Sequence, residues 1–239
     1  MGTLSIVATP IGNMQDISLR AIETLLTADV IACEDTRRAG LLLQKMREMV
    51  PNFTEDKKPQ LISFYDQVEL EKTPEIITLL KKGINVSLIS DAGTPTVSDP
   101  GFKLIRECIK ERIQVTSIPG PSAAIVALTV SGLPTDKFFF VGYPPKKEGH
   151  RKELYESLKS LKGSLKTTVI MYEAPHRIQG TLKEFAEIFG ESMEVVVARE
   201  LTKIYEEVLH DSVANLQKHF AKKEPKGEFV LLFQSDQLV

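Results

Sequence analysis

The sequence predicts an α/β protein with two α/β domains, the first built on a mostly parallel sheet and the second on a mixed sheet. Short β-branched and aliphatic runs alternate with helical patterns almost from the first residue, which is typical of parallel strands joined by crossover helices. A Ser-Gly-Leu-Pro break at 131–134 interrupts this alternation, and beyond it the strand-like runs follow one another more closely. We therefore expect a boundary near residues 118–134, with domains over 1–120 and 121–239.

Each element of the first half has its own local signal. Pro51 ends the second helix, Gly83 ends the third, and Ser122 is a residue type that caps helices. The polar segment 51–59 carries a proline at each end and is expected to be a surface loop. We expect strands over 4–8, 30–32, 61–63, 85–90 and 114–118, and helices over 19–27, 39–49, 74–82, 102–111 and 122–130.

The second half has more strands per residue, which favours a mixed sheet. Aliphatic and aromatic runs predict its strands, and apolar residues at helical spacing predict its helices. The expected strands are 138–141, 168–172, 194–198, 206–210 and 228–234, and the expected helices are 152–161, 178–189 and 212–220.

Composition and charge limit the classes of partner and the cellular location that we expect for this chain. Thirty basic and thirty-two acidic side chains give a net charge of −2, so contact with nucleic acid would need a local basic patch. Cys33 and Cys108 lie in apolar surroundings, as expected for buried free thiols in a reducing compartment. The N-terminal residues do not resemble a signal peptide, and no apolar run reaches the length of a membrane span. We expect a cytoplasmic protein without membrane attachment.

Three Gly- and Pro-rich turns follow predicted strands, at 9–13 (TPIGN), 90–101 (SDAGTPTVSDPG) and 119–122 (PGPS). Ligands of open parallel sheets bind outside the carboxyl ends of the strands, so these turns are placed to line one crevice. Glycine lets main-chain N–H groups approach a ligand closely. A single such turn more often only ends a strand, but three on one edge favour a binding site.

Several common site motifs do not occur in the sequence. It has no G-x-G-x-x-G after the first strand, no P-loop, no H-E-x-x-H, no C-x-x-C and no G-x-S-x-G. Ser122 is therefore interpreted as a helix cap beside a ligand rather than a nucleophile. No spacing typical of metal ligands is present, and we expect no metal.

Charged side chains gather after the second strand, at Glu34, Asp35, Arg37 and Arg38. A carboxylate there could accept a hydrogen bond from a ribose or another hydroxyl. Asp35 is equally a residue type that caps the following helix. The cluster by itself is compatible with either role.

Similar clusters lie at strand ends in the second half. The segment YEAPHR (172–177) ends one strand, Arg199 and Glu200 end another, and Lys226 and Gly227 precede the last. Turn chemistry with Pro175 at a first helical position is the alternative for YEAPHR. The basic run KKEGHRK (146–152) follows Tyr-Pro-Pro; such runs are usually solvated surface, and the alternative is contact with phosphates.

Taken together, eight phrases resemble one family. They are VATPIGNMQDISLRA, ACEDTR, SDAGTPTVSDPG, IPGPSA, GLPTDKFFF, YEAPHRI, ARELTK and PKGEFVLL. They occur in the expected order, and the resemblance extends from residue 4 to about residue 233. The sequence is thereby identified as similar to the bacterial 16S ribosomal RNA cytidine 2′-O-methyltransferases. These are class III S-adenosylmethionine (SAM) methyltransferases of the tetrapyrrole-methylase-like superfamily. The phrases EDTR, YEAPHR and ARELTK distinguish the RNA branch from the porphyrinoid and diphthine branches.

The resemblance implies a homodimer that binds SAM in a cleft which the C-terminal domain completes. The implied substrate is a cytidine ribose in the decoding region of 16S ribosomal RNA, within the small ribosomal subunit. The residues it implies for cofactor binding are Pro10, Asp91, Ala92, Gly93, Thr94, Ser122, Ala123, Tyr172, Ala198 and Gly227.

Methyl transfer to a hydroxyl needs alignment and a group that takes or offsets the proton. The candidates for a general base are Glu34, Asp35 and Glu200, and those for holding phosphate or charge are Arg37, Arg199 and Lys226. Two other functions stay open: a small-molecule methylase of the tetrapyrrole type, and a non-catalytic RNA-binding factor of ribosome assembly.

The sequence departs from the family pattern in three places. Thr96 and Val97 stand where Gly-Ile is usual, Arg38 stands where His is frequent, and the connection over 45–60 is longer. Thr96 lies next to the expected cofactor loop, where it could alter the shape of the site.

Overall fold

The computed structural model describes residues 1–55, 57–160, 167–222 and 224–234, and the chain divides into two compact units, Met1–Ser122 and Ala123–Val239. Each unit is built on a five-stranded sheet. The first sheet is parallel and the second is mixed, which confirms the predicted fold class.

The first sheet has the strand order β3-β2-β4-β1-β5 with all neighbours parallel. Its strands are short and β2 and β4 are buried along their whole length, because helices cover both faces. The bounds are β1 Thr3–Val7, β2 Val30–Cys33, β3 Gln60–Ser63, β4 Val86–Leu88 and β5 Gln114–Ile118.

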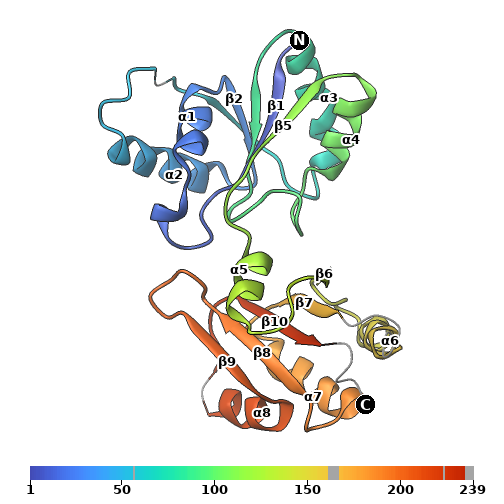
Figure 1. Ribbon diagram of the computed structural model, residues 1–239. Helices are drawn as coiled ribbons and strands as arrows, with labels where there is room; N and C mark the ends of the chain where they lie inside the picture. Colours follow the sequence, from blue (N-terminus) through green and yellow to red (C-terminus); the bar gives the residue numbers. More distant parts are fainter. Residues whose placement is uncertain (56, 161–166, 223, 235–239) are drawn as a thin grey trace. The chain divides into compact units, whose positions relative to one another are not determined.

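Alternate residues of these strands point to opposite faces of the sheet and pack into two separate hydrophobic cores. Figure 1 shows α1 and α2 on one side of the sheet and α3 and α4 on the other. Val7, Ile31 and Cys33 pack towards α1 and α2, whereas Leu4 and Ile6 pack towards α3 and α4. The helices are α1 Leu19–Thr27, α2 Thr36–Met49, α3 Glu69–Lys81 and α4 Phe102–Lys110, with a short 3-10 turn at Met14–Asp16.

Two helices of this unit begin earlier than predicted. The α2 helix begins at Thr36 rather than residue 39 because Asp35 caps it. The α3 helix begins at Glu69 and contains Pro74, which was expected to start it. Proline costs the hydrogen bond to the carbonyl four residues back, here that of the exposed Leu70, which water can reach.

The start of α4 is held by a residue from α3. Its N-cap is Gly101 at φ 128°, without a side-chain cap, although Ser98 and Asp99 just before it are residue types that cap helices. Instead the buried Glu69 carboxylate accepts hydrogen bonds from the N–H groups of Gly101 and Lys103, each at 3.0 Å. A carboxylate at a helix N-terminus also offsets the helix dipole.

The second sheet has the order β6-β7-β10-β8-β9, in which only β6 and β7 are parallel. The last strand, β10, lies between β7 and β8 and runs antiparallel to both. The bounds are β6 Phe138–Gly142, β7 Thr168–Glu173, β8 Glu194–Arg199, β9 Glu207–Ser212 and β10 Phe229–Gln234.

Helices cover both faces of this sheet as well. The aromatic core of Tyr155, Phe185, Phe189 and Phe233 lies under α6, α7 and α8. Figure 1 shows α5 on the opposite side from α7 and α8. The helices are α5 Ala123–Val130, α6 Glu148–Lys159, α7 Ile178–Phe189 and α8 Val213–Ala221.

The α6 helix begins at Glu148, four residues before its predicted start, and residue 161 of that prediction lies outside the described residues. The β9 strand runs from Glu207 rather than residue 206 and continues to Ser212. Within the described ranges, no helix has the length and apolar character needed to cross a membrane.

Replacing the cap of α4 should destabilise the first unit. We expect Glu69→Ala to lower the free energy of unfolding by about 2 kcal/mol, because two main-chain N–H groups lose a charged acceptor. Urea unfolding measures this, with the exposed Glu71→Ala in the same helical turn as the control. Equal effects of the two substitutions would contradict the capping role.

Candidate functional site

The loops that follow β1 and β4 are joined by main-chain hydrogen bonds. Thr9 N–H donates to the Gly93 carbonyl at 2.8 Å, and Gly93 N–H donates back to the Thr9 carbonyl at 3.1 Å. The Thr9 hydroxyl is buried and lies 3.3 Å from the Ser90 carbonyl. This pairing places Pro10 beside the 91–94 loop, as the crevice hypothesis requires.

The turn after β5 joins the same edge. The Thr94 hydroxyl donates to the Pro121 carbonyl at 2.8 Å, which brings the residue before Ser122 to the loop after β4. Gly120 permits this approach, since a Cβ there would lie 2.9 Å from the Cβ of Ala8. Gly93 adopts φ 85°, a conformation that favours glycine. The three predicted turns therefore meet at one edge of the sheet.

Glu34, at the end of β2, connects to this group. Its carboxylate accepts a hydrogen bond from Asp91 N–H at 3.1 Å, and Arg38 forms an ion pair with the Asp91 carboxylate at 2.8 Å. Burial raises the pKa of Glu34, and the negative charges of Asp91 and Asp66 add to the rise. Glu34 is therefore a stronger proton acceptor than an ordinary glutamate.

Asp35 and Arg37 have a different role from Glu34. The Asp35 carboxylate accepts from Arg37 N–H at 2.8 Å and pairs with its guanidinium at 2.8 Å, so it is the cap of α2. These hydrogen bonds lower the pKa of Asp35 to about 2, which makes it a weak base. The Arg37 side chain is 88% exposed and can still meet an anion from solvent.

Asp99 is a titratable group near this edge that the sequence did not single out as a site residue. Burial and the negative charge of Glu34 raise its pKa to about 6, while a hydrogen bond with Ser90 opposes the rise. The sequence signal was weak, because an Asp before Pro-Gly fits an ordinary turn.

Thr96 occupies a strained position in the same loop. Its φ of 72° and that of Ser98, 69°, fall in the left-handed region. A β-branched residue is rarely found there, and glycine adopts it without strain. Thr96 therefore concentrates strain next to the predicted cofactor loop.

In the second unit, three predicted residues lie near one another on one face of the sheet. Val230 of β10 is paired with Tyr172 on one side and with Ala198 on the other. Ala124 N–H, in the first turn of α5, donates to the Tyr172 hydroxyl at 3.3 Å. Tyr172 thus links the helix that starts at Ala123 to the strands that carry Ala198.

Arg199, Glu200, Lys226 and Gly227 form a second group, at the ends of β8 and β10. Arg199 Nε donates to the Lys226 carbonyl at 2.7 Å, and its Nη1 lies 3.2 Å from a Glu207 carboxylate oxygen. These bonds fix the position of the Arg199 side chain. They involve the main-chain carbonyl of Lys226 and not its ammonium group.

Glu200 is less suited than Glu34 to act as a base. Burial opposes its ionisation, but hydrogen bonds from Lys203 and from Glu228 N–H outweigh this and lower its pKa. A Cβ on Gly227, at φ 93°, would lie 2.4 Å from the Glu200 Cγ. The absence of a side chain at Gly227 therefore provides the space that the Glu200 side chain occupies.

The described residues contain no group of three or more His, Cys, Asp or Glu side chains arranged to hold a metal ion. Cys33 and Cys108 are both buried free thiols, as predicted.

Comparison with known proteins identifies the family. Residues 3–217 match the profile of the tetrapyrrole (corrin/porphyrin) methylases. A curated protein of Thermotoga maritima, named ribosomal RNA small subunit methyltransferase I, is 43% identical over 97% of this chain and 98% of its own length. The chain belongs to this methyltransferase family. A member from Escherichia coli O157:H7 with the same name is 40% identical over 98% of this chain and 78% of its own length. The resemblance found in the sequence is confirmed.

Solved structures agree on the fold of these methyltransferases. Diphthine synthase aligns with a TM-score of 0.70 at 16% identity, over 98% of this chain and 89% of its own. Uroporphyrin-III-C-methyltransferase from Thermus thermophilus aligns with a TM-score of 0.65 at 19% identity, over 100% of this chain and 97% of its own. At these identities the likeness is one of fold alone.

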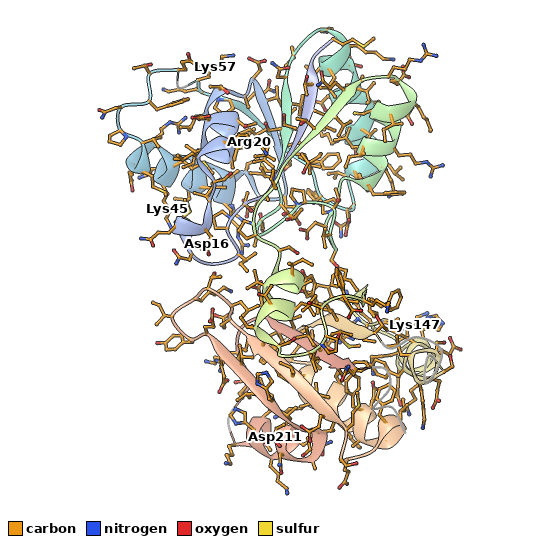
Figure 2. The ribbon with its side chains drawn as sticks, in the orientation of Figure 1. Asp16, Arg20, Lys45, Lys57, Lys147 and Asp211 are labelled. Atoms are coloured by element: carbon orange, nitrogen blue, oxygen red, sulfur yellow. The ribbon has the colours of Figure 1, made fainter. Side chains whose placement is uncertain are left out.

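The raised pKa of Asp99 gives the stability a pH dependence. The folded protein holds this proton more tightly than the unfolded chain, so stability should fall as pH rises from 3.8 to about 6, by at most about 1.4 kcal/mol per pH unit. Asp99→Asn should remove that fall and be more stable than the parent above pH 6. Urea unfolding between pH 4 and pH 7 measures this, with the exposed Asp16→Asn (Figure 2) as control. Parallel pH curves for the parent and Asp99→Asn would contradict it.

Proposed function

We propose that this chain is a SAM-dependent methyltransferase of small-subunit ribosomal RNA that modifies the 2′-oxygen of a cytidine ribose. The relatives named ribosomal RNA small subunit methyltransferase I, 40–43% identical over nearly the full chain, support the ribosomal RNA substrate. The cytidine 2′-oxygen is what the resemblance in the sequence implies. Matches to porphyrinoid and diphthine enzymes reach only 15–19% identity, so a small-molecule methylase has less support. The resemblance also implies a homodimer, which we keep as part of the proposal.

The groups at the strand ends suit S-adenosylmethionine. Asp91 and Ala92 are exposed, and the Asp91 carboxylate can accept from hydroxyl or ammonium groups. In the second unit, Tyr172 offers an aromatic ring, and Gly227 lies where the main chain has left-handed geometry. When bound, the cofactor supplies an electrophilic methyl group on sulfur. The remaining residues of the proposed set are Pro10, Gly93, Thr94, Ser122, Ala123 and Ala198.

Glu34 is our proposed general base. Among the three carboxylates that the sequence offered, only its pKa is raised, whereas those of Asp35 and Glu200 are lowered. A base of raised pKa takes a hydroxyl proton more readily than an ordinary carboxylate does. Arg37 is exposed for an RNA phosphate. Arg199 and Lys226 are assigned to joining the end of β8 to the segment that precedes β10.

Incubation with labelled SAM and small ribosomal subunits that lack the modification tests this function. We expect label in 16S ribosomal RNA, recovered as 2′-O-methylcytidine after nuclease digestion. Label on a nucleobase would overturn the assignment to ribose. Cofactor binding without any transfer would favour the non-catalytic assembly factor.

Within the same assay, Glu34→Gln should lower kcat by about 100-fold, the low end for loss of a general base. The amide oxygen can still accept from Asp91 N–H, so the cofactor Kd should stay unchanged. The parent should lose activity as Glu34 becomes protonated, at a higher pH than an ordinary glutamate would, and the variant should lack this limb. The control is Glu23→Gln, exposed on α1. An unchanged kcat for Glu34→Gln would exclude Glu34 as the base.

A further inference from the structure

The second unit contains a pocket of about 950 Å³. The described residues that line it do not belong to the proposed cofactor-binding or catalytic set. It lies between the loop after β6 and the turn that leads into α7. Its lining includes Tyr143, Pro145 and Lys146 from the loop and His176 and Arg177 from the turn. Its volume is in the range of pockets that hold small ligands.

Two partly buried ion pairs fix the walls of this pocket. Arg151 of α6 forms a two-pronged pair with the Glu184 carboxylate of α7, and its Nη1 donates to the carbonyls of Pro145 and Lys146. Arg177 Nε lies 3.3 Å from a carboxylate oxygen of the buried Glu173. The loop is therefore held in place before any ligand arrives.

Arg177 also holds the loop from the other side. Its Nη2 donates to the Pro144 carbonyl at 2.9 Å and lies 3.3 Å from that of Pro145. Because Glu173 and Glu184 offset the charges of the two arginines, these arginines serve as scaffold. This gives the arginine of YEAPHR a structural role.

The basic side chains left for a ligand are Lys146 and His176, of which Lys146 supplies a fixed positive charge. Both side chains are exposed, and neither forms an ion pair within the part of the chain that the structure describes. Among the described residues that line the pocket, none is an aspartate or a glutamate. Lys147, labelled in Figure 2, is the N-cap of α6 and adds positive charge near the same loop. The pocket therefore favours an anionic ligand.

Tyr143 adds a flat surface. It is 52% exposed, and its other contacts include an edge-to-face packing against Tyr172 with ring centroids 5.4 Å apart. An aromatic ring beside a cation is the arrangement by which proteins hold single-stranded nucleotides, through base stacking and a phosphate contact.

We propose that this pocket binds a nucleotide of the RNA substrate other than the one that is methylated, with its phosphate at Lys146 and its base against Tyr143. The inference rests on the proposed function. It explains how a chain of net charge −2 attracts a polyanion, since Lys146 is exposed at this pocket while the nearby carboxylates of Glu173 and Glu184 are paired with arginines.

The salt dependence of binding to small ribosomal subunits tests the phosphate contact. Lys146→Ala should weaken binding about 5-fold and reduce the slope of log K against log salt by about 0.7, the value for one phosphate of a single strand. The cofactor Kd should not change. The control is Lys218→Ala, an exposed lysine on α8 that is not part of the lining.

The Tyr143 ring is tested by substitution in two steps. Tyr143→Leu should weaken RNA binding about 10-fold through lost stacking, and Tyr143→Phe should restore it. A loss of cofactor affinity in Lys146→Ala or Tyr143→Leu would assign the pocket to the cofactor and overturn the proposal. An unchanged RNA affinity and salt slope in both would also overturn it.

The same assays separate the two hypotheses. If the parent chain transfers no methyl group to the subunit, the proposed function fails. If the parent methylates RNA while Lys146→Ala and Tyr143→Leu match it in KM and salt dependence, only the pocket assignment fails.

Discussion

The pair of main-chain hydrogen bonds between Thr9 and Gly93 is the constraint on which the candidate site of the first unit depends. Parallel strands β1 and β4 are neighbours, so their following loops leave the sheet at the same edge. Pairing these loops beyond the strands leaves Asp91 and Ala92 at the surface with a fixed main chain. Glu34 connects this pair of loops to the end of β2, and Thr94 connects it to the turn after β5. The candidate site is therefore held together by main-chain hydrogen bonds. A search for the sequence motifs of common cofactor-binding folds does not detect such a site.

In the second unit, an antiparallel strand brings the predicted site residues together. Because β10 enters between β7 and β8, its first residues lie against the ends of both neighbours. This arrangement gathers Tyr172, Ala198 and Gly227, which are far apart in the sequence. The ion pairs of Arg151 and Arg177 instead shape the separate loop after β6. One unit thus carries two features of different chemistry, an aromatic and main-chain surface and a pocket with exposed cations.

Much of the fold could be predicted from the sequence because hydrophobic alternation marks each strand and helix. The α1, α7 and β5 ranges are correct to the residue. The cap of α4 could not be predicted, since Glu69 lies 32 residues from Gly101 and only the tertiary packing of α3 against α4 brings them together. The same holds for Asp99, whose pKa depends on burial and on Glu34, a residue of another loop. Local patterns found the loops of the site, but the roles of their carboxylates required the fold.

Hydrogen exchange at the 91–94 loop tests the central claim most directly, since it reports whether the paired strand ends are the cofactor site. Addition of S-adenosylmethionine to the full chain should slow exchange at the amides of Ala92 and Thr94, while those of the α8 helix exchange as before. Binding of the cofactor, shown by calorimetry, without slower exchange at 91–94 would contradict the account.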